Sequence, residues 1–111
     1  MSDCLRKLLL PGELVLHQSH ASAVGSNPLS GIEIMVTRQR LLVREGLISR
    51  RIDTRMVRDI VAIEVDQGLL GRLFDLGNVR ISFGRPNMTP LELRDIARPR
   101  ELQRTLLNLL R

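Results

Sequence analysis

Short stretches of alternating apolar and polar residues recur along this chain of 111 residues, and clusters of Gly, Pro, Asn and Ser separate them. Such alternation predicts β-strands that bury one face. Seven strands are expected, at 13–19, 32–37, 40–45, from Gly46 past Arg51, 60–67, 78–83 and 91–96. Pro99 suits the first position of a helix, and a leucine stripe follows at Leu102, Leu106 and Leu109. This order predicts a mainly β fold, an antiparallel barrel or sandwich plugged by the C-terminal helix.

The second and third strands set a register that the sequence itself can test. A two-residue turn at Arg38 and Gln39 creates four cross-strand pairs: Val36 with Leu41, Ile34 with Val43, Met35 with Leu42 and Glu33 with Arg44. Three pairs are apolar and one joins opposite charges, and each such pair stabilises a sheet by a few tenths of a kcal/mol up to ~1. Because a slip by one residue would spoil all four pairs, we expect this register.

The next predicted turn, at Glu45 and Gly46, gives a poorer register. It creates three pairs: Val43 with Ile48, Leu41 with Arg50 and Arg40 with Arg51. Arg50 then lies on the inward face, and two like charges stand opposite each other, which destabilises a sheet. A bulge could shift the register, Arg50 could reach past the core, or an anion or carboxylate could lie between these groups, with Asp53 the nearest candidate.

Three further expectations concern which residues face the core. In the first strand, Leu14 and Leu16 are expected to point inward. The fifth and sixth strands each offer an alternating apolar face: Val61, Ile63 and Val65, then Val79, Ile81 and Phe83. Between these two strands lies an apolar connection at helical spacing: Leu69, Leu70, Leu73 and Phe74. Such a connection is expected to be buried as a plug that stops at a left-handed Gly77, so Phe74→Ala should cost roughly 3–5 kcal/mol.

The N-terminal residues 1–12 are expected to form a short segment of one or two helical turns, capped by Ser2 and stopped by Pro11, ahead of a domain at 13–111. The single cysteine, Cys4, cannot form an internal disulfide, which favours a reducing compartment and an ordinary surface or half-buried thiol. Neither a signal peptide nor an apolar run of about 18 residues is found. We expect a cytoplasmic protein, with a peripheral position at the inner face of the membrane as the alternative.

The charge balance is basic, with a net charge of +5 and a sequence pI near 11.2. All but one of the 17 basic residues are Arg, the exception being Lys7. This ratio, beside abundant Leu and Val, is typical of GC-rich coding, so the arginines do not by themselves indicate phosphate binding. The two aromatic residues, Phe74 and Phe83, both lie in apolar patterns, whereas single-strand binding needs exposed aromatic rings. Nucleic acid is therefore the weakest of the partner classes considered.

Two segments carry a resemblance to a known family. Thr37-Arg-Gln-Arg-Leu41 and Gly46-Leu-Ile-Ser-Arg50 resemble the "T-x-x-R-L…G-x-x-x-R" pattern of bacterial pleckstrin-homology-like (PH-like) domains. The segment 67–81, Gln-Gly-Leu-Leu-Gly-Arg-Leu-Phe-Asp-Leu-Gly-Asn-Val-Arg-Ile, is similar to their "Q-S-x-L-G-R-L-x-G-x-G-x-V-x-I". The likeness covers about residues 9–110, and it departs from the pattern at Gly68 (usually Ser) and Asp75 (usually Gly).

The resemblance implies a seven-stranded, partly open barrel of two nearly orthogonal sheets, with one end closed by the C-terminal helix. It implies little about function, because the activities of the family are largely unassigned and a fold does not carry function with it. Eukaryotic relatives that bind phosphoinositides use basic residues beside the loop between strands one and two. The corresponding stretch, 17–31, has no Lys or Arg, so binding of that kind is not expected.

The densest basic region supplies the candidate binding residues. A site for an anionic partner is predicted at Arg38, Arg40, Arg44, Arg50 and Arg51, with Arg55 and Arg58 nearby. Each exposed Arg would stabilise binding to acidic lipid headgroups by about 1 kcal/mol. An acidic protein is the other partner that this region could bind. The alternative is a solvated face in which these arginines alternate with Glu33, Glu45, Asp53 and Asp59.

The remaining side chains offer no reactive set. His17 and His20 are the only histidines, and without a nearby Cys or carboxylate they would make a poor metal site. No Ser or Thr has a His and an acid at a recognisable spacing, and no Gly-rich phosphate loop is present. No catalytic residue, metal, cofactor or small-molecule substrate is therefore predicted.

Three functions follow as hypotheses, each of them non-catalytic. The first is an interaction module that binds a protein partner or self-associates, using an open sheet edge or a groove beside the helix. The second is peripheral binding to an anionic membrane surface through the Arg-rich region. The third is nucleic-acid binding, which salt would weaken strongly.

Overall fold

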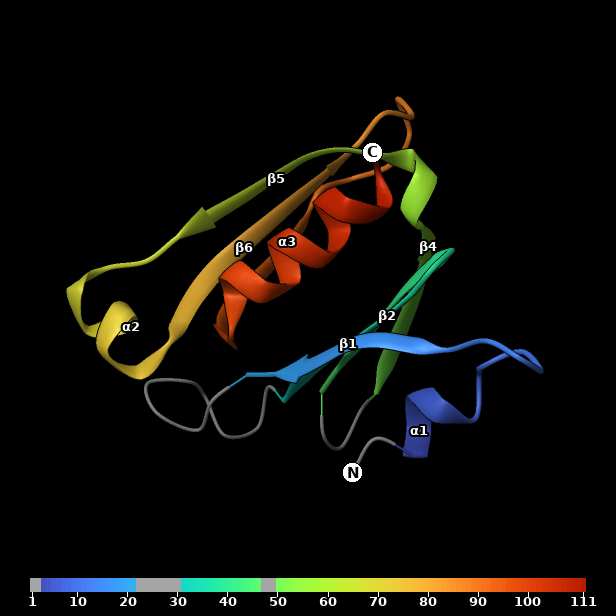
Figure 1. Cartoon of the computed structure of the whole chain (residues 1–111), viewed down its shortest axis with the longest axis horizontal. Helices are drawn as coiled ribbons and strands as arrows, with labels where there is room; N and C mark the ends of the chain where they lie inside the picture. The colour runs from blue at the N-terminus through green and yellow to red at the C-terminus, as the bar shows by residue number, and fades with distance from the viewer. Residues whose placement is uncertain (1–2, 22–30, 47–49) are drawn as a thin grey trace.

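The computed structural model describes residues 3–21, 31–46 and 50–111 of the chain, and it consists of two antiparallel sheets with a helix between them (Figure 1). The first sheet has the order β1-β2-β3-β4, formed by β1 (Val15–His20), β2 (Ile32–Thr37), β3 (Arg40–Glu45) and β4 (Arg51–Met56). The second has the order β5-β6-β7, formed by β5 (Ile60–Asp66), β6 (Leu76–Phe83) and β7 (Leu91–Ala97). The helices are α1 (Asp3–Arg6), η1 (Val57–Asp59), α2 (Leu69–Phe74) and α3 (Pro99–Leu109).

The two sheets meet at one corner and do not close into a barrel. Among the described residues, one isolated bridge, between Ala21 and Ile96, joins the end of β1 to β7, while η1 makes the connection on the other side. Helix α3 lies between the sheets and packs against β1, β5 and β6 (Figure 1). The predicted mainly β, partly open PH-like architecture with a C-terminal helix is therefore confirmed.

The core fills the space between the sheets and the inner face of α3. Ile34, Val36, Leu41 and Val43 of the first sheet meet the inner face of the second, which is lined by Val79, Ile81, Phe83 and Leu93. Pro99 begins α3 as predicted, and Leu102 and Leu106 are fully buried in the same core. The predicted face of β6 is thus confirmed. The face of β5 is confirmed only in part, because a register irregularity between Ile60 and Ala62 leaves Val61 exposed.

The two hairpin registers had opposite outcomes. All four predicted pairs of β2 and β3 are present, from Val36 with Leu41 to Glu33 with Arg44. The predicted β3–β4 register is wrong: Leu41 pairs with Arg55, Val43 with Asp53 and Glu45 with Arg51. The connection runs from Gly46 to Arg50 rather than through a tight turn at Glu45 and Gly46, so the Arg40–Arg51 clash does not arise. Ile48 itself lies outside the described residues.

The predicted inward face of β1 is also wrong. Leu14 is 73% exposed and Leu16 is exposed as well, whereas His17 and Ser19 are buried. A register irregularity between Val15 and His17 changes which side chains face inward. The loop predicted between β1 and β2 falls mainly on residues 22–30, which lie outside the described residues.

The N-terminal segment packs against the outer face of the first sheet. Leu5 of α1 is fully buried in a small cluster with Met35 and Leu42, and Leu9 and Val15 cover it. The strand residues Met35 and Leu42 therefore bury their side chains on the face opposite the main core. The predicted cap, Ser2, lies outside the described residues.

The predicted apolar plug is the largest correction. None of the residues of α2 is buried, and Leu69, Leu70, Leu73 and Phe74 are 56–86% exposed. Because β5 and β6 are hydrogen-bonded neighbours, their connection lies beyond the ends of both strands, where it cannot reach the core (Figure 1). The helix ends at a left-handed Asp75 rather than at Gly77. Gly77 is instead a close-approach position, because a Cβ there would lie 2.7 Å from Cγ of Gln67.

Candidate functional site

The five arginines of the predicted site lie at two ends of one strand. Arg38 stands in the β2–β3 turn and Arg40 at the start of β3, whereas Arg44 lies near its end and Arg50 and Arg51 follow across the next connection. Since a strand rises about 3.3 Å per residue, the length of β3 separates the two groups. The proposed anionic partner would therefore have to span both ends of the hairpin to meet all five side chains.

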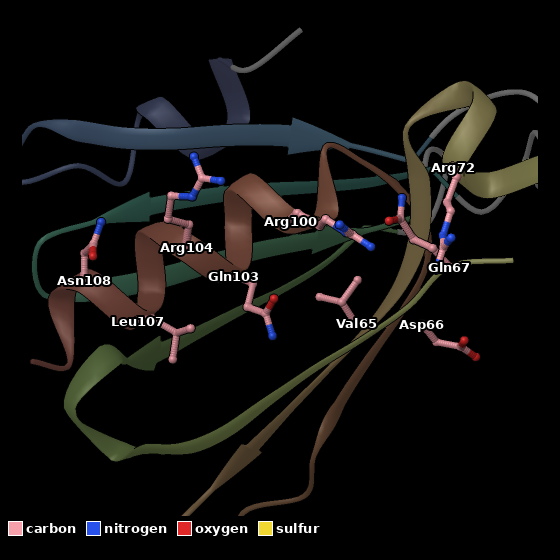
Figure 2. Close-up of a pocket in the computed structure, with 9 residues that line it drawn as sticks. All are labelled: Val65, Asp66, Gln67, Arg72, Arg100, Gln103, Arg104, Leu107 and Asn108. Atoms are coloured by element: carbon pink, nitrogen blue, oxygen red, sulfur yellow. The ribbon is translucent and has the colours of Figure 1, made fainter. Parts of the chain in front are cut away.

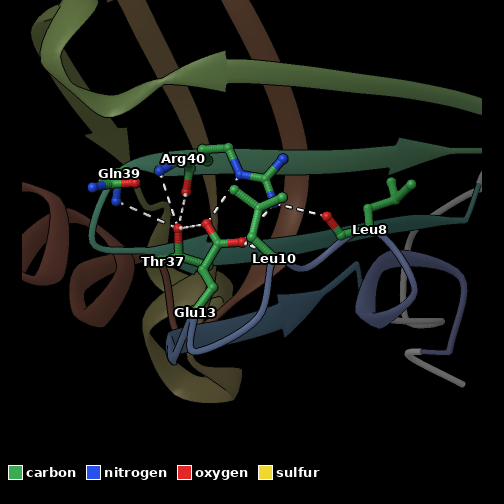
Figure 3. Close-up of polar contacts among 6 residues, drawn as sticks. All are labelled: Leu8, Leu10, Glu13, Thr37, Gln39 and Arg40. Atoms are coloured by element: carbon green, nitrogen blue, oxygen red, sulfur yellow. Dashed lines mark hydrogen bonds and ion pairs between the residues drawn. The ribbon is translucent and has the colours of Figure 1, made fainter.

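Arg40 is held by a network within the molecule (Figure 3). Its Nη2 lies 2.5 Å from Oε1 of Glu13 and its Nε donates to Oε2 at 3.0 Å. The backbone carbonyl of Leu8 accepts a further hydrogen bond from Arg40 at 2.8 Å. The Glu13 carboxylate also accepts hydrogen bonds from the Thr37 hydroxyl at 2.7 Å and from the Leu10 backbone N–H at 2.9 Å. This network joins the segment before β1 to the β2–β3 turn.

The electrostatics of this network follow from its geometry. The side chains of Glu13 and Arg40 are only 9% and 17% exposed, so the guanidinium is the main counter-charge of the carboxylate. Hydrogen bonds from Arg40, the largest cause, lower the pKa of Glu13 to about 2, and burial opposes this change. The same pairing raises the pKa of Arg40. Its bonding within the fold gives Arg40 a structural role.

Two further arginines of this region are bonded within the fold. Nη1 of Arg44 donates to the carbonyl of Gly46 at 2.9 Å, and its Nη2 lies 3.9 Å from a carboxylate oxygen of Glu33. Arg55 pairs with Asp53 at 3.0 Å, and its guanidinium lies 4.6 Å from the ring centroid of Phe83. Asp53 thus partners Arg55 rather than Arg50. Arg38, Arg50 and Arg51 are exposed.

Helix α2 carries the most prominent exposed feature of the described chain. Four large apolar side chains lie within six residues, at Leu69, Leu70, Leu73 and Phe74, and each keeps more than half of its surface in water. Soluble proteins expose single apolar residues freely, but a contiguous group of large ones marks an interaction site. The helical spacing of these residues in the sequence predicted them to be buried in the core. Their position in the connection between two strands that pair as a hairpin was the signal in the sequence that these residues lie outside the core.

A second apolar surface lies at the opposite end of the molecule. Leu10, Leu14 and Leu16 are exposed, and together with Pro11 and Arg38 they line a hollow of about 290 Å³. In Figure 1 this segment before β1 is at the far right, and α2 is at the far left. At this volume, near the small end of ligand pockets (~300–1,000 Å³), the hollow suits one or two side chains better than a cofactor.

His17 and Ser19 lie closer together than their sequence spacing indicated. As alternate residues of β1 they share its buried face, and His17 Nε2 is 3.1 Å from the Ser19 hydroxyl oxygen. Burial, the main cause, lowers the pKa of His17, and the positive charge of Arg98 acts in the same direction. Ser19 is only 1% exposed, so a substrate has no access to its hydroxyl. The pair satisfies two buried polar groups beneath α3.

The described residues form neither a cluster of metal ligands nor a membrane-spanning helix. Within 3–21, 31–46 and 50–111, no three His, Cys, Asp or Glu side chains gather as the ligands of a metal ion would. Helices in this part of the chain are all too short or too polar to cross a membrane.

Comparison with known proteins bears on the fold. Residues 28–110 match the family described as "Bacterial PH domain". A crystal structure described as the C-terminal domain of an unknown protein from Leishmania infantum has a similar fold, with a TM-score of 0.67 and 12% sequence identity. The match covers 98% of this chain and 93% of that one, and at such low identity it speaks for the fold alone. No curated protein matches the sequence.

Proposed function

This chain belongs to the bacterial PH domain family, and on that premise we propose that it is a self-associating interaction module whose docking element is helix α2. Members of the family are typically non-catalytic modules. The observation that carries the proposal is the exposure of four large apolar side chains on one short helix: Leu69, Leu70, Leu73 and Phe74. Burying each such side chain gains about 1.5–3 kcal/mol, so a partner that covers α2 has a strong driving force.

We propose that α2 of one copy docks in the apolar hollow of a second copy. That hollow is concave and lined by Leu10, Leu14 and Leu16, whereas α2 protrudes from the end of a hairpin. Charge favours the same docking, because exposed Asp75 ends α2 and exposed Arg38 borders the hollow. Neither of them forms an ion pair with another residue of the described ranges. The apolar side chains of α2 and the charge of Asp75 thus match the apolar lining and Arg38 of the hollow in the next copy.

The test uses two variants, each of which damages one of these surfaces. Leu73→Glu places a charge on α2, and Leu14→Glu places one in the hollow. Because each variant alone lacks one half of the contact, both should be monomeric by light scattering and sedimentation at concentrations where the wild type associates. Mixed together, Leu14→Glu supplies an intact α2 and Leu73→Glu an intact hollow, so a 1:1 dimer and nothing larger should form.

Val61→Glu is the matched control, since Val61 is an exposed apolar residue of β5 away from both surfaces. It should associate like the wild type. A wild type that stays monomeric at all concentrations, or a mixture that fails to dimerise, would overturn the proposal. So would wild-type association by Leu73→Glu. If the protein stays monomeric but Leu73→Glu abolishes its sedimentation with anionic vesicles, α2 is a membrane contact instead.

A further inference from the structure

A second hollow, distinct from both apolar surfaces, lies between α3, the end of β5 and α2 (Figure 2). Its volume is about 650 Å³, and its lining is polar and basic. Three arginines contribute to it: Arg72 from α2, and Arg100 and Arg104 from α3. Asp66 is the one acidic residue of the lining, so the charge of the hollow is net positive by two.

The side chains of these three arginines lack partners among the described residues, as do those of Arg38 and Arg58, but these three share one hollow. Six arginines of the described ranges form ion pairs with Asp or Glu. The side chains of Arg72, Arg100 and Arg104 form neither an ion pair nor a hydrogen bond with any described residue. Figure 2 shows Arg100 pointing along α3 toward Gln67, and Arg72 extending from α2 on the Gln67 side of the hollow. Arg104 leaves α3 one turn further on and points away from Gln67.

The position of the arginines on α3 works against the stability of that helix. Arg100 is the second residue of α3, where a cation opposes the helix dipole. Arg104 follows at i+4, and like charges at this spacing repel each other along a helix. Glu101, the acidic residue of the first turn, pairs with Arg98 at 3.2 Å. A bound anion would offset both costs, so their presence indicates a role outside folding.

The floor of the hollow is fixed by amide side chains. Gln67 donates from Nε2 to the Leu76 carbonyl at 2.9 Å and to the Gly71 carbonyl at 3.5 Å. Gln103 donates from Nε2 to the Ile63 carbonyl at 3.1 Å. Gly77 keeps Gln67 and Pro99 close, because a Cβ at this position would lie 2.7 Å from Gln67 Cγ and 3.1 Å from Pro99 Cγ. The two elements that carry Arg72 and Arg100 are therefore held at a set separation.

We propose that this hollow binds a phosphate ester or diphosphate. Guanidinium groups present paired N–H donors that match the oxygens of a phosphate. Arg72 and Arg100 bring two such groups to one hollow from different elements. The volume exceeds what a single phosphate fills, which leaves room for the group that bears it along α3 toward Arg104. Asp66 at the rim disfavours a ligand with several charges on that side. The shared chemistry fits a soluble phosphate compound or a lipid headgroup, and the experiment distinguishes the two.

The probe for the soluble source is inorganic pyrophosphate, followed by titration calorimetry and by amide shifts in NMR spectra of the full chain. Arg72→Gln and Arg100→Gln should each weaken binding about tenfold or more, as expected for a lost hydrogen bond to a charged group. Arg58→Gln is the matched control, because Arg58 is an exposed arginine of η1 outside the hollow. Thermal melts check that each variant is folded.

The probe for the lipid source is a phosphatidylcholine vesicle with or without phosphatidic acid. Sedimentation that requires phosphatidic acid and is lost in Arg72→Gln and Arg100→Gln assigns the site to a headgroup, and pyrophosphate binding without it assigns a soluble ligand. Absence of both, or equal losses in Arg58→Gln, would overturn the proposal. Leu14→Glu, which tests self-association from the apolar hollow at the other end of the molecule, should bind pyrophosphate like the wild type, so the two proposals can fail separately.

Discussion

The surroundings of Arg40 and those of Arg72 show what separates a structural arginine from an available one. The Arg40 guanidinium donates to the Glu13 carboxylate and the Leu8 carbonyl, and the Thr37 hydroxyl donates to the same carboxylate. Arg72 stands on a helix with four exposed apolar neighbours, and its side chain has no described partner. Charge density along the sequence points to the first region, where the fold uses Arg40 but leaves Arg38 exposed. In the second region, Arg72 shares one hollow with two further arginines that have no side-chain partner among the described residues. The available surface of this fold therefore lies where side chains lack partners.

The largest expected effect tests the boundary between core and surface on α3. Leu106 is fully buried, and Leu107, its neighbour in the sequence, is 49% exposed. Leu106→Ala should lower the free energy of unfolding by ~2–5 kcal/mol because it leaves a cavity. Leu107→Ala should change it by less than about 0.5 kcal/mol. Urea unfolding of both variants measures the difference, and similar losses would mean that α3 is rotated relative to the sheets.

The next effect concerns the structural arginine. Arg40→Met removes the charged partner of Glu13 and leaves a carboxylate that is 9% exposed, so unfolding should become easier by roughly 2–3 kcal/mol. Adding Glu13→Gln in the same chain should recover part of this loss, because the unpaired charge is then gone. Arg72→Met, the control from the other region, should stay within about 0.5 kcal/mol of the wild type. Equal losses of stability in Arg40→Met and Arg72→Met would show that the two arginines do not differ in structural role.

Acid should weaken the same pairing. The pKa of Glu13 in the folded protein is lowered from 4.5 to about 2, chiefly by Arg40. Its carboxylate therefore contributes stability that is complete above pH 4.5 and is lost as the pH falls toward 2. Since other carboxylates titrate in this window, the measurement is the difference between the wild type and Glu13→Gln. That difference should shrink by roughly 1–2 kcal/mol on acidification, and a constant difference would contradict the pairing.

The smallest effect is the most direct correction of the sequence-based expectation. Phe74→Ala should change the stability of the monomer by less than about 0.5 kcal/mol, because the ring is largely in water. The free energy of unfolding is measured at a protein concentration low enough for the chain to be monomeric. A loss of stability as large as that of Leu106→Ala would show that Phe74 is buried, as the sequence predicted.

Much of the fold could be predicted because its determinants are local. The β2–β3 register follows from four side-chain pairs and one two-residue turn, and the stripe of α3 follows from Leu102 and Leu106. The β3–β4 register failed because a longer connection, from Gly46 to Arg50, replaced the tight turn. On β1, an irregular residue before His17 changed the inward face. Neither a loop length nor a bulge leaves a periodic trace in the sequence.

The candidate surfaces were harder to predict because the exposure of a side chain depends on how distant elements of the chain pack around it. Leu73 and Leu106 are both leucines at helical spacing, and only the position of each helix relative to the sheets decides which is buried. Likewise, Arg72 and Arg100 are 28 positions apart in sequence and line one hollow only because α2 and α3 meet at the end of β5. Partners for Arg40 were equally non-local, since Glu13 lies 27 residues before it.

The placement of the two apolar surfaces at opposite ends of the molecule limits the kind of assembly that a contact between them can build. A contact between unlike surfaces is heterologous: each copy that docks its α2 still offers its own hollow to another copy. Growth then stops only if the rotation between successive copies closes a ring, and it continues as a filament if the rotation does not. For this chain, the angle between α2 and the segment before β1 would set the stoichiometry.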